Sequence, residues 1–243
     1  MAFIRTICES LALKPVQVDT VYGQTVAITC EMNSGQGKVR LLVFSVRLER
    51  EKEGLRGRLD ILRGMEGREG VLRVREVAGF ETAEKLAAVV DWTDMNLATD
   101  IESRRQQNYP YPESQILLIA YTVLKALSAL QATALGPLAV SPANIFVTEA
   151  GEVLLFPIEM HAENLAIGRN REVREDLLGL GLTLWCMVDL KTSRSEVEGE
   201  GLETLKRRIS PSLFAIIQGA IRGLEESQLL AQLEAAIHLV QDI

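Results

Sequence analysis

Residues 137–147 read PLAVSPANIFV, residues 151–159 read GEVLLFPIE, and residues 176–185 read DLLGLGLTLW. The region around them, Gln115–Leu190, has the pattern of a long helix, a loop, two short strands, a second loop and a very apolar helix. A helix that is apolar on all sides is normally buried in the core of a protein. We therefore expect this region to form the centre of the fold, with the last helix at its core.

The segments before and after this region differ in character. The first part predicts a short helix over Phe3–Leu13 that ends at a Pro15 break, and then strands on both sides of a charged helix. The predicted order is strands 25–30 and 39–46, helix 49–63, strands 71–77 and 85–91, a linker helix 94–101 and the long helix from Glu113 or Ser114 to Gln131. An exposed acidic loop (191–201) and amphipathic segments 202–209, 212–224 and 227–240 complete the chain. This pattern is of the α+β class.

Composition excludes several functional classes. The chain has 243 residues and a net charge of −7, which argues against nucleic-acid binding and against an anionic membrane surface. Its apolar runs are shorter than the roughly 18–20 residues of a transmembrane helix, and the N-terminus lacks the apolar core of a signal peptide. Three widely spaced cysteines, Cys8, Cys30 and Cys186, suit a reducing compartment and no metal site. We expect a cytoplasmic protein.

The order of the elements resembles that of eukaryotic-type protein kinases. The loop, the two short strands and the buried helix are similar to the catalytic loop, the metal-binding motif and the central helix of the larger kinase lobe. The strands around the charged helix resemble the smaller lobe. The resemblance implies one two-lobed kinase-like domain over 1–243, with an N-terminal extension (1–20), an N-lobe (21–93) and a C-lobe (94–243).

The resemblance also implies that the catalytic charges are lost in the larger lobe. Counted back from Asn144, the family's His-Arg-Asp falls on Pro137, Leu138 and Ala139, and the loop Lys falls on Ser141. Ala139 cannot accept the proton of a substrate hydroxyl. The family's Asp-Phe-Gly falls on Pro157, Ile158 and Glu159, and Pro157 offers no metal ligand.

The smaller lobe shows the same loss. The family's strand Lys falls on Val46, with Arg47 one register away and expected to point outward. Without that Lys, Asp60 and Glu66 are expected to be solvated surface acids. The glycine-rich loop, expected near residues 22–28, has only Gly23.

Three matching positions remain. Asn144 matches the Mg²⁺-binding Asn of the family, and it is also interpreted as an amide that caps the loop. Asp176 matches the Asp that opens the central helix and whose carboxylate ties down the catalytic loop. Gly181 matches the packing face of that helix, together with Leu180, Leu184 and Trp185.

The favoured hypothesis is a catalytically inactive pseudokinase that acts as a scaffold or allosteric partner of other proteins and needs no cofactor. The segment Leu124–Ser128 resembles that of the Scy-like trafficking pseudokinases, whose kinase-like part is followed by a long helical-repeat region, whereas this sequence stops at Ile243. One alternative binds ATP without transferring phosphate, through Asn144 and Arg47. Another is a kinase that recruits Glu159 as a metal ligand. A third is an unrelated α+β adaptor for trafficking or the cytoskeleton.

The sequence leaves the partner and the oligomeric state open. His161 and His238 are expected to be ordinary surface residues.

Overall fold

The computed structural model describes residues 2–22, 25–33, 35, 37–79, 84–133, 135, 138, 140–158, 173–192 and 201–241. The chain forms two compact units. The first contains the described residues up to Thr93 together with Ile158, and the second contains Asp94–Pro157 and the described residues from 173 onward.

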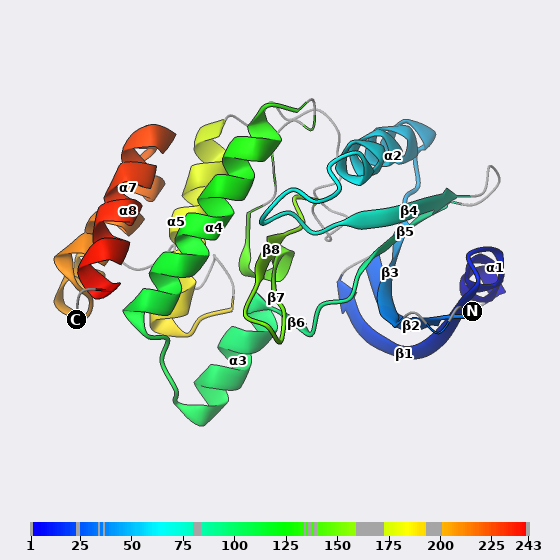
Figure 1. Cartoon of the computed structure of the whole chain (residues 1–243), viewed down its shortest axis with the longest axis horizontal. Coiled ribbons are helices and arrows are strands. Elements are labelled where there is room, and N and C mark those ends of the chain that lie inside the picture. Colours follow the sequence, from blue (N-terminus) through cyan, green and yellow to red (C-terminus); the bar gives the residue numbers. More distant parts are fainter. Residues whose placement is uncertain are drawn as a thin grey trace. The chain divides into compact units, whose positions relative to one another are not determined.

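A five-stranded antiparallel sheet forms the centre of the first unit (Figure 1). Its spatial order is β1-β2-β3-β5-β4. The strands are β1 (Leu13–Tyr22), β2 (Thr25–Met32), β3 (Lys38–Ser45), β4 (Val74–Gly79) and β5 (Lys85–Asp91), and helix α2 (Glu49–Arg63) lies between β3 and β4 in the chain. The predicted order of strand, strand, helix, strand, strand is confirmed. The bounds of the helix and of the last strand are those predicted, whereas β4 begins at Val74, three residues later than expected.

The prediction for the N-terminus is wrong from Leu11 onward. Helix α1 spans Ala2–Ser10, Ala12 adopts a φ of 52°, and the chain then enters β1, which continues through Pro15. A proline lacks the N–H that an inner strand needs, but β1 is an edge strand and its pairing register shifts between Pro15 and Gln17. The second part of the predicted extension, from Leu13 onward, is therefore an edge strand of the sheet.

Helix α1 packs on one face of this sheet. Its buried side chains Ile7 and Cys8 share a core cluster with residues of β1, β2, β3 and β5. The strand residues of this cluster are Leu13, Ile28, Cys30, Val39, Leu41, Val43, Ala87 and Val89. In β3 these are the odd-numbered positions, so the even-numbered side chains of β3 point to the opposite face.

Helices dominate the second unit. They are α3 (Leu97–Gln107), α4 (Glu113–Gln131), α5 (Val173–Asp189), α7 (Pro211–Arg222) and α8 (Glu226–Gln241), with 3₁₀ helices η1 (Pro142–Asn144) and η3 (Leu202–Arg207). Strands β6 (Met95–Asn96), β7 (Ile145–Val147) and β8 (Val153–Leu155) form a small sheet. The predicted long helix and the two short strands are confirmed. The predicted linker helix begins later, at Leu97, and the loop predicted at 191–201 lies mostly outside the described residues.

Helix α5 is the core of the second unit, as its composition predicts. Every side chain from Asp176 to Met187 is buried except that of Leu178. The helix begins at Val173, so Asp176 lies in its first turn and does not open it. At Gly181 an added Cβ would lie 2.7 Å from Ile221 Cγ1 and 3.0 Å from Ile221 N. Only glycine therefore allows α7 to approach α5 this closely.

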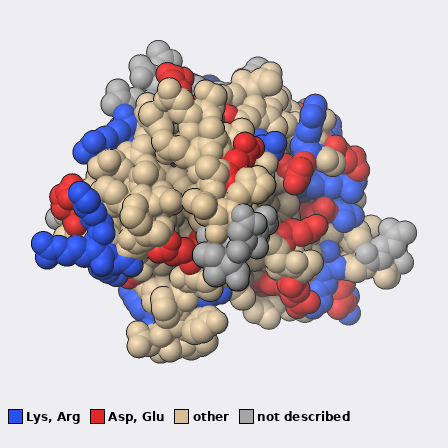
Figure 2. All heavy atoms as spheres, turned by 60° about the vertical axis from the view of Figure 1, so that its left-hand side comes forward, with Lys and Arg blue, Asp and Glu red and all other residues tan. Residues whose placement is uncertain are grey.

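The outward face of α4 and α8 carries few charges. Leu118 on α4 and Leu239 on α8 are exposed, as are Ala231 and Ala235 of α8. Figure 2 brings the α7–α8 side forward, and the middle of that view is largely uncharged. Among the described helices, α4 alone is long and apolar enough to cross a membrane. Half of its most apolar window is buried, however, and the core helix of a soluble protein has the same properties.

Replacing Gly181 by Ala is expected to destabilise the protein by about 1–3 kcal/mol, because the new methyl group overlaps Ile221. Gly57→Ala is the matched control in an exposed part of α2, where nothing lies within 4 Å of the added Cβ. This control should gain about 0.5–1 kcal/mol from helix propensity. Urea unfolding of both variants measures the difference, and equal effects would contradict the close α5–α7 contact.

Candidate functional site

The loop between α4 and β7 is built on short-range backbone hydrogen bonds. The Asn144 N–H donates to Ser141 O at 3.0 Å and closes the 3₁₀ turn η1. Asn144 O accepts from the Phe156 N–H at 2.9 Å, which ties this turn to the end of β8. Asn144 itself is 3% exposed. The polypeptide around Asn144 is therefore held from both ends.

Helix α5 fixes the start of the same loop through Asp176. The Leu138 N–H donates to Asp176 Oδ1 at 3.0 Å, and both residues are buried. An added Cβ at Gly179 would lie 2.6 Å from Val140 O, so the loop backbone rests directly on the helix. This contact between helix and loop is of the kind that the kinase resemblance assigns to Asp176.

Not all of the predicted site residues can be placed. Pro137, Ala139, Glu159 and Gly23 lie outside the described residues. Ser141 is half-buried, and Pro157 is buried immediately after Phe156. The described loop residues, 138 and 140–147, contain no carboxylate and no imidazole. This part of the loop therefore supplies neither a general base nor a charged metal ligand.

In the first unit, Arg40 is a residue that sequence reasoning missed. Among the described strands, β3 carries two cations, Lys38 and Arg40, and only Arg40 is buried. Its Nη1 donates to Thr93 Oγ1 at 3.0 Å, and its Nε lies 3.6 Å from Asp19 Oδ2. The guanidinium also lies over the Trp92 ring, 5.0 Å from its centroid. β3 thus holds a buried cation, and Asp19, Trp92 and Thr93 all belong to the first unit.

A β-bulge supplies the carboxylate of this cluster. The register of β1 with β2 shifts between Val18 and Thr20, which leaves Asp19 without a partner residue on β2. The Thr29 hydroxyl lies 2.7 Å from both carboxylate oxygens of Asp19 and donates to them. Asp19, Thr29 and Arg40 therefore form one polar group on three adjacent strands. A lone Arg inside an apolar strand was a signal for this cluster, but the bulge has no comparable sequence signature.

The position assigned to the strand Lys differs from that of Arg40. Val46 is buried and lies one residue beyond the end of β3, and Arg47 is exposed, as expected. The spacing from the sequence therefore places the Lys position at the end of the strand, six residues after the buried cation.

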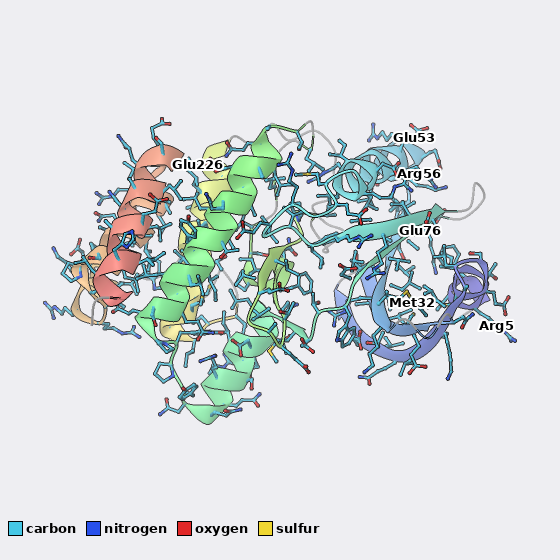
Figure 3. All side chains as sticks on the ribbon, viewed as in Figure 1. Arg5, Met32, Glu53, Arg56, Glu76 and Glu226 are labelled. Atoms are coloured by element: carbon cyan, nitrogen blue, oxygen red, sulfur yellow. The ribbon has the colours of Figure 1, made fainter. Side chains whose placement is uncertain are left out.

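The charged helix α2 buries a cation and exposes its acids. Lys52 is 5% exposed and its Nζ lies 3.5 Å from Glu49 Oε1. Asp60 is exposed and pairs with Arg63 at 3.4 Å, and the exposed Glu66, just beyond the helix, pairs with Arg73. The prediction that these two acids are surface residues is thus confirmed. Figure 3 labels Glu53 and Arg56 on α2 and Glu76 on β4, which continue this charged surface.

The titratable groups that the structure describes give no sign of a metal centre. Within the described part of the chain, no group of three or more His, Cys, Asp or Glu side chains could hold a metal ion. His238 is exposed on α8, and His161 lies outside the described residues.

Tyr111 has a raised pKa because it is buried and donates to Asp100 Oδ2 at 2.6 Å. Arg104 lies over the Tyr111 ring and pairs with Asp100, so this cluster joins α3 to the start of α4.

Comparison with solved structures identifies the fold. The kinase domain of PknI from Mycobacterium tuberculosis matches with a TM-score of 0.73 and 16% identity, over 92% of this chain and 96% of that one. Another structure of the same kinase domain matches with a TM-score of 0.72 and 15% identity, over 92% and 94% of the two chains. No protein-family model matches the sequence, and no curated protein does. The chain therefore has a protein-kinase-like α+β fold, with a β-rich N-lobe that carries one helix between its strands and a mostly helical C-lobe.

Replacing Asp176 by Ala is expected to destabilise the protein by about 1–3 kcal/mol, because the buried Leu138 N–H loses its acceptor. Asp176→Asn keeps an acceptor oxygen at the same place and should be the milder change. Denaturant unfolding of both variants measures the contribution of this hydrogen bond. An Asn variant as unstable as the Ala variant would show that the negative charge is what matters.

A double-mutant cycle tests the cluster in the first unit. Arg40→Leu alone leaves Asp19 without its cation and should cost up to roughly 3–5 kcal/mol, the range for breaking a buried pair. Adding Asp19→Asn should recover part of this loss, because the two side chains interact. Additive losses in unfolding free energy would contradict the proposed coupling.

Proposed function

We propose that this chain is a pseudokinase, a kinase-like domain that transfers no phosphate and acts as a scaffold or allosteric partner of other proteins. The observation that carries the proposal is the arrangement of charges in the first unit. The buried cation of β3 is bound by Asp19 and Thr93, and the buried charged side chain of α2 is Lys52.

Phosphoryl transfer in this fold requires a cation on the third strand that is paired with a carboxylate of the helix. A Lys on the third strand binds the α- and β-phosphates and is held by a carboxylate of the helix. Here the four acids of α2 are Glu49, Glu51, Glu53 and Asp60, and none of them is buried. Arg40 has a carboxylate partner, but that partner comes from the edge strand β1. The pair therefore stabilises the sheet and leaves no helix-held Lys for a nucleotide.

The positions assigned to the catalytic loop support the same proposal. In the alignment by spacing, Ala139 replaces the catalytic Asp, Ser141 the loop Lys and Pro157 the metal-binding Asp. An alanine methyl group and a proline ring can neither accept a proton nor bind Mg²⁺. Asn144 is retained, but one neutral amide does not replace two carboxylates. No nucleotide or metal is therefore part of the proposed function.

The architectural contacts are retained beside these replacements. Asp176 holds the loop, and Gly179 and Gly181 permit the close packing of α5. A fold that is kept while its chemistry is lost can still bind other proteins through its surface. The likeness to kinase domains, at 15–16% identity, concerns the fold alone. The proposed partners are other proteins, and the proposed location is the cytoplasm.

A thermal-shift titration with ATP, with and without Mg²⁺, tests the proposal. A ligand that binds only the folded state adds RT ln(1 + [L]/Kd), about 2.7 kcal/mol at a hundredfold excess over Kd. We expect no shift at millimolar ATP and no transfer of labelled phosphate to a generic protein substrate or to the chain itself.

Two outcomes would contradict the proposal. A Mg²⁺-dependent shift without transfer would favour the nucleotide-binding switch, and loss of that shift in Asn144→Ala and Arg47→Ala would locate the site. Phosphate transfer that disappears in Glu159→Gln would favour the kinase that recruits Glu159. Arg5→Ala is a suitable control for both experiments, because Arg5 is exposed and pairs only with Glu9 among the described contacts.

A further inference from the structure

Two cysteines meet where α1 packs on the sheet. Cys8 of α1 and Cys30 of β2 are 2% and 0% exposed and belong to one core cluster. Both are free thiols, and each lies near enough to the other to influence its pKa. The two side chains are therefore neighbours in this cluster although their residues belong to different elements.

The geometry of both elements produces this contact. Ile4, Ile7, Cys8 and Leu11 follow the spacing of one helix face, and all four pack in or against the core cluster. Ile28 and Cys30 alternate along β2 and point to the same face of the sheet. The Asn33 N–H donates to Ala12 O at 3.0 Å, which joins the end of α1 to the end of β2.

We propose that Cys8 and Cys30 are a redox modification site, at which an intrachain disulfide fastens α1 to β2. This inference is independent of the proposed pseudokinase function. The oxidant is a low-molecular-weight disulfide such as oxidised glutathione. One cysteine thiolate attacks it, which forms a mixed disulfide and releases one glutathione thiolate. The second cysteine thiolate attacks the protein sulfur of that mixed disulfide and releases the other glutathione. Two thiols are thus oxidised while one glutathione disulfide is reduced.

The closed structure protects these thiols. Burial raises the pKa of Cys30 to about 12 and also raises that of Cys8, so little thiolate is present at neutral pH. The reaction therefore requires α1 to leave the sheet. A nine-residue helix has little stability of its own, and such local opening needs less free energy than global unfolding. The rate of cross-linking should follow the opening of α1.

The test incubates the full chain with oxidised glutathione and measures its intact mass. The chain is then unfolded in denaturant, because all three cysteines are buried in the folded chain, the remaining thiols are alkylated, and non-reduced peptides are analysed. We expect a loss of about 2 Da, one alkylated cysteine, Cys186, and a linked pair of peptides that contain Cys8 and Cys30. Thermal unfolding of the oxidised protein should begin at a temperature roughly 5 °C higher or more, because the cross-link restricts the unfolded chain.

Variants separate this site from non-specific oxidation. Cys186→Ser should form the same link, whereas Cys8→Ser and Cys30→Ser should not. Arg5→Gly weakens α1 at an exposed position and should accelerate linkage about fivefold. Glu234→Gly, at an exposed position of α8, should leave the rate unchanged.

Several results would overturn the proposal. One is a stable glutathione adduct on Cys8 or Cys30 without the internal bond, and another is linkage between two chains. A link that forms only under globally unfolding conditions, at the same rate in Arg5→Gly, would also overturn it. Wild-type protein that keeps three alkylatable thiols after prolonged oxidation would have the same meaning.

Discussion

The hydrogen bond from the Leu138 N–H to the Asp176 carboxylate connects helix α5 to the loop before β7. The other elements of the second unit are arranged around this helix and this loop. From Leu177 to Met187, α5 is almost entirely apolar and buried, so it can sit at the core of a helical lobe. The loop before β7 carries backbone groups that must be satisfied inside the protein. One carboxylate in the first turn of α5 meets that need, and Gly179 lets the loop rest on the helix. The short strands β7 and β8 then continue from a loop whose position the core helix has already set.

In the first unit, the polar group that must be satisfied inside the protein is the side chain of Arg40. A buried Arg must have partners, because an unpaired charge inside a protein is strongly unfavourable. Arg40 finds them in Asp19, Thr93 and Trp92, which come from β1 and from the segment after β5. The bulge at Asp19 brings a carboxylate to this cluster from the edge of the sheet. The first three strands are thus joined to the segment after β5 by a polar group, and the apolar cluster under α1 also links β1, β2, β3 and β5.

Sequence reasoning succeeded where local pattern and tertiary structure agree. The charged helix 49–63 has leucines on one face and ends before Gly64, and its buried Leu55, Leu59 and Leu62 follow that face. It failed at the N-terminus, because Pro15 reads as a break unless the strand is known to be an edge. It also missed Arg40 and Asp19, since their pairing depends on a bulge and on strand order rather than on any local motif. The loop around Asn144 was predicted in outline, but Ala139 and Glu159 lie outside the described residues, so their assignment rests on spacing alone.

Residues in the core of this fold and residues on its surface are under different physical constraints. Residues such as Asp176, Gly179 and Gly181 are enclosed by packed backbone, where most substitutions create an overlap or an unsatisfied group. Residues that contact a nucleotide or substrate have no such role in packing, so replacing them leaves the core unchanged. Apolar positions tolerate exchange for other apolar residues of similar volume. A chain with 15–16% identity can therefore match a kinase domain over 92% of its length. In such a chain, similarity of fold is evidence that the packing of the core is conserved in kind. Whether the chain transfers phosphate depends on charged side chains outside the core.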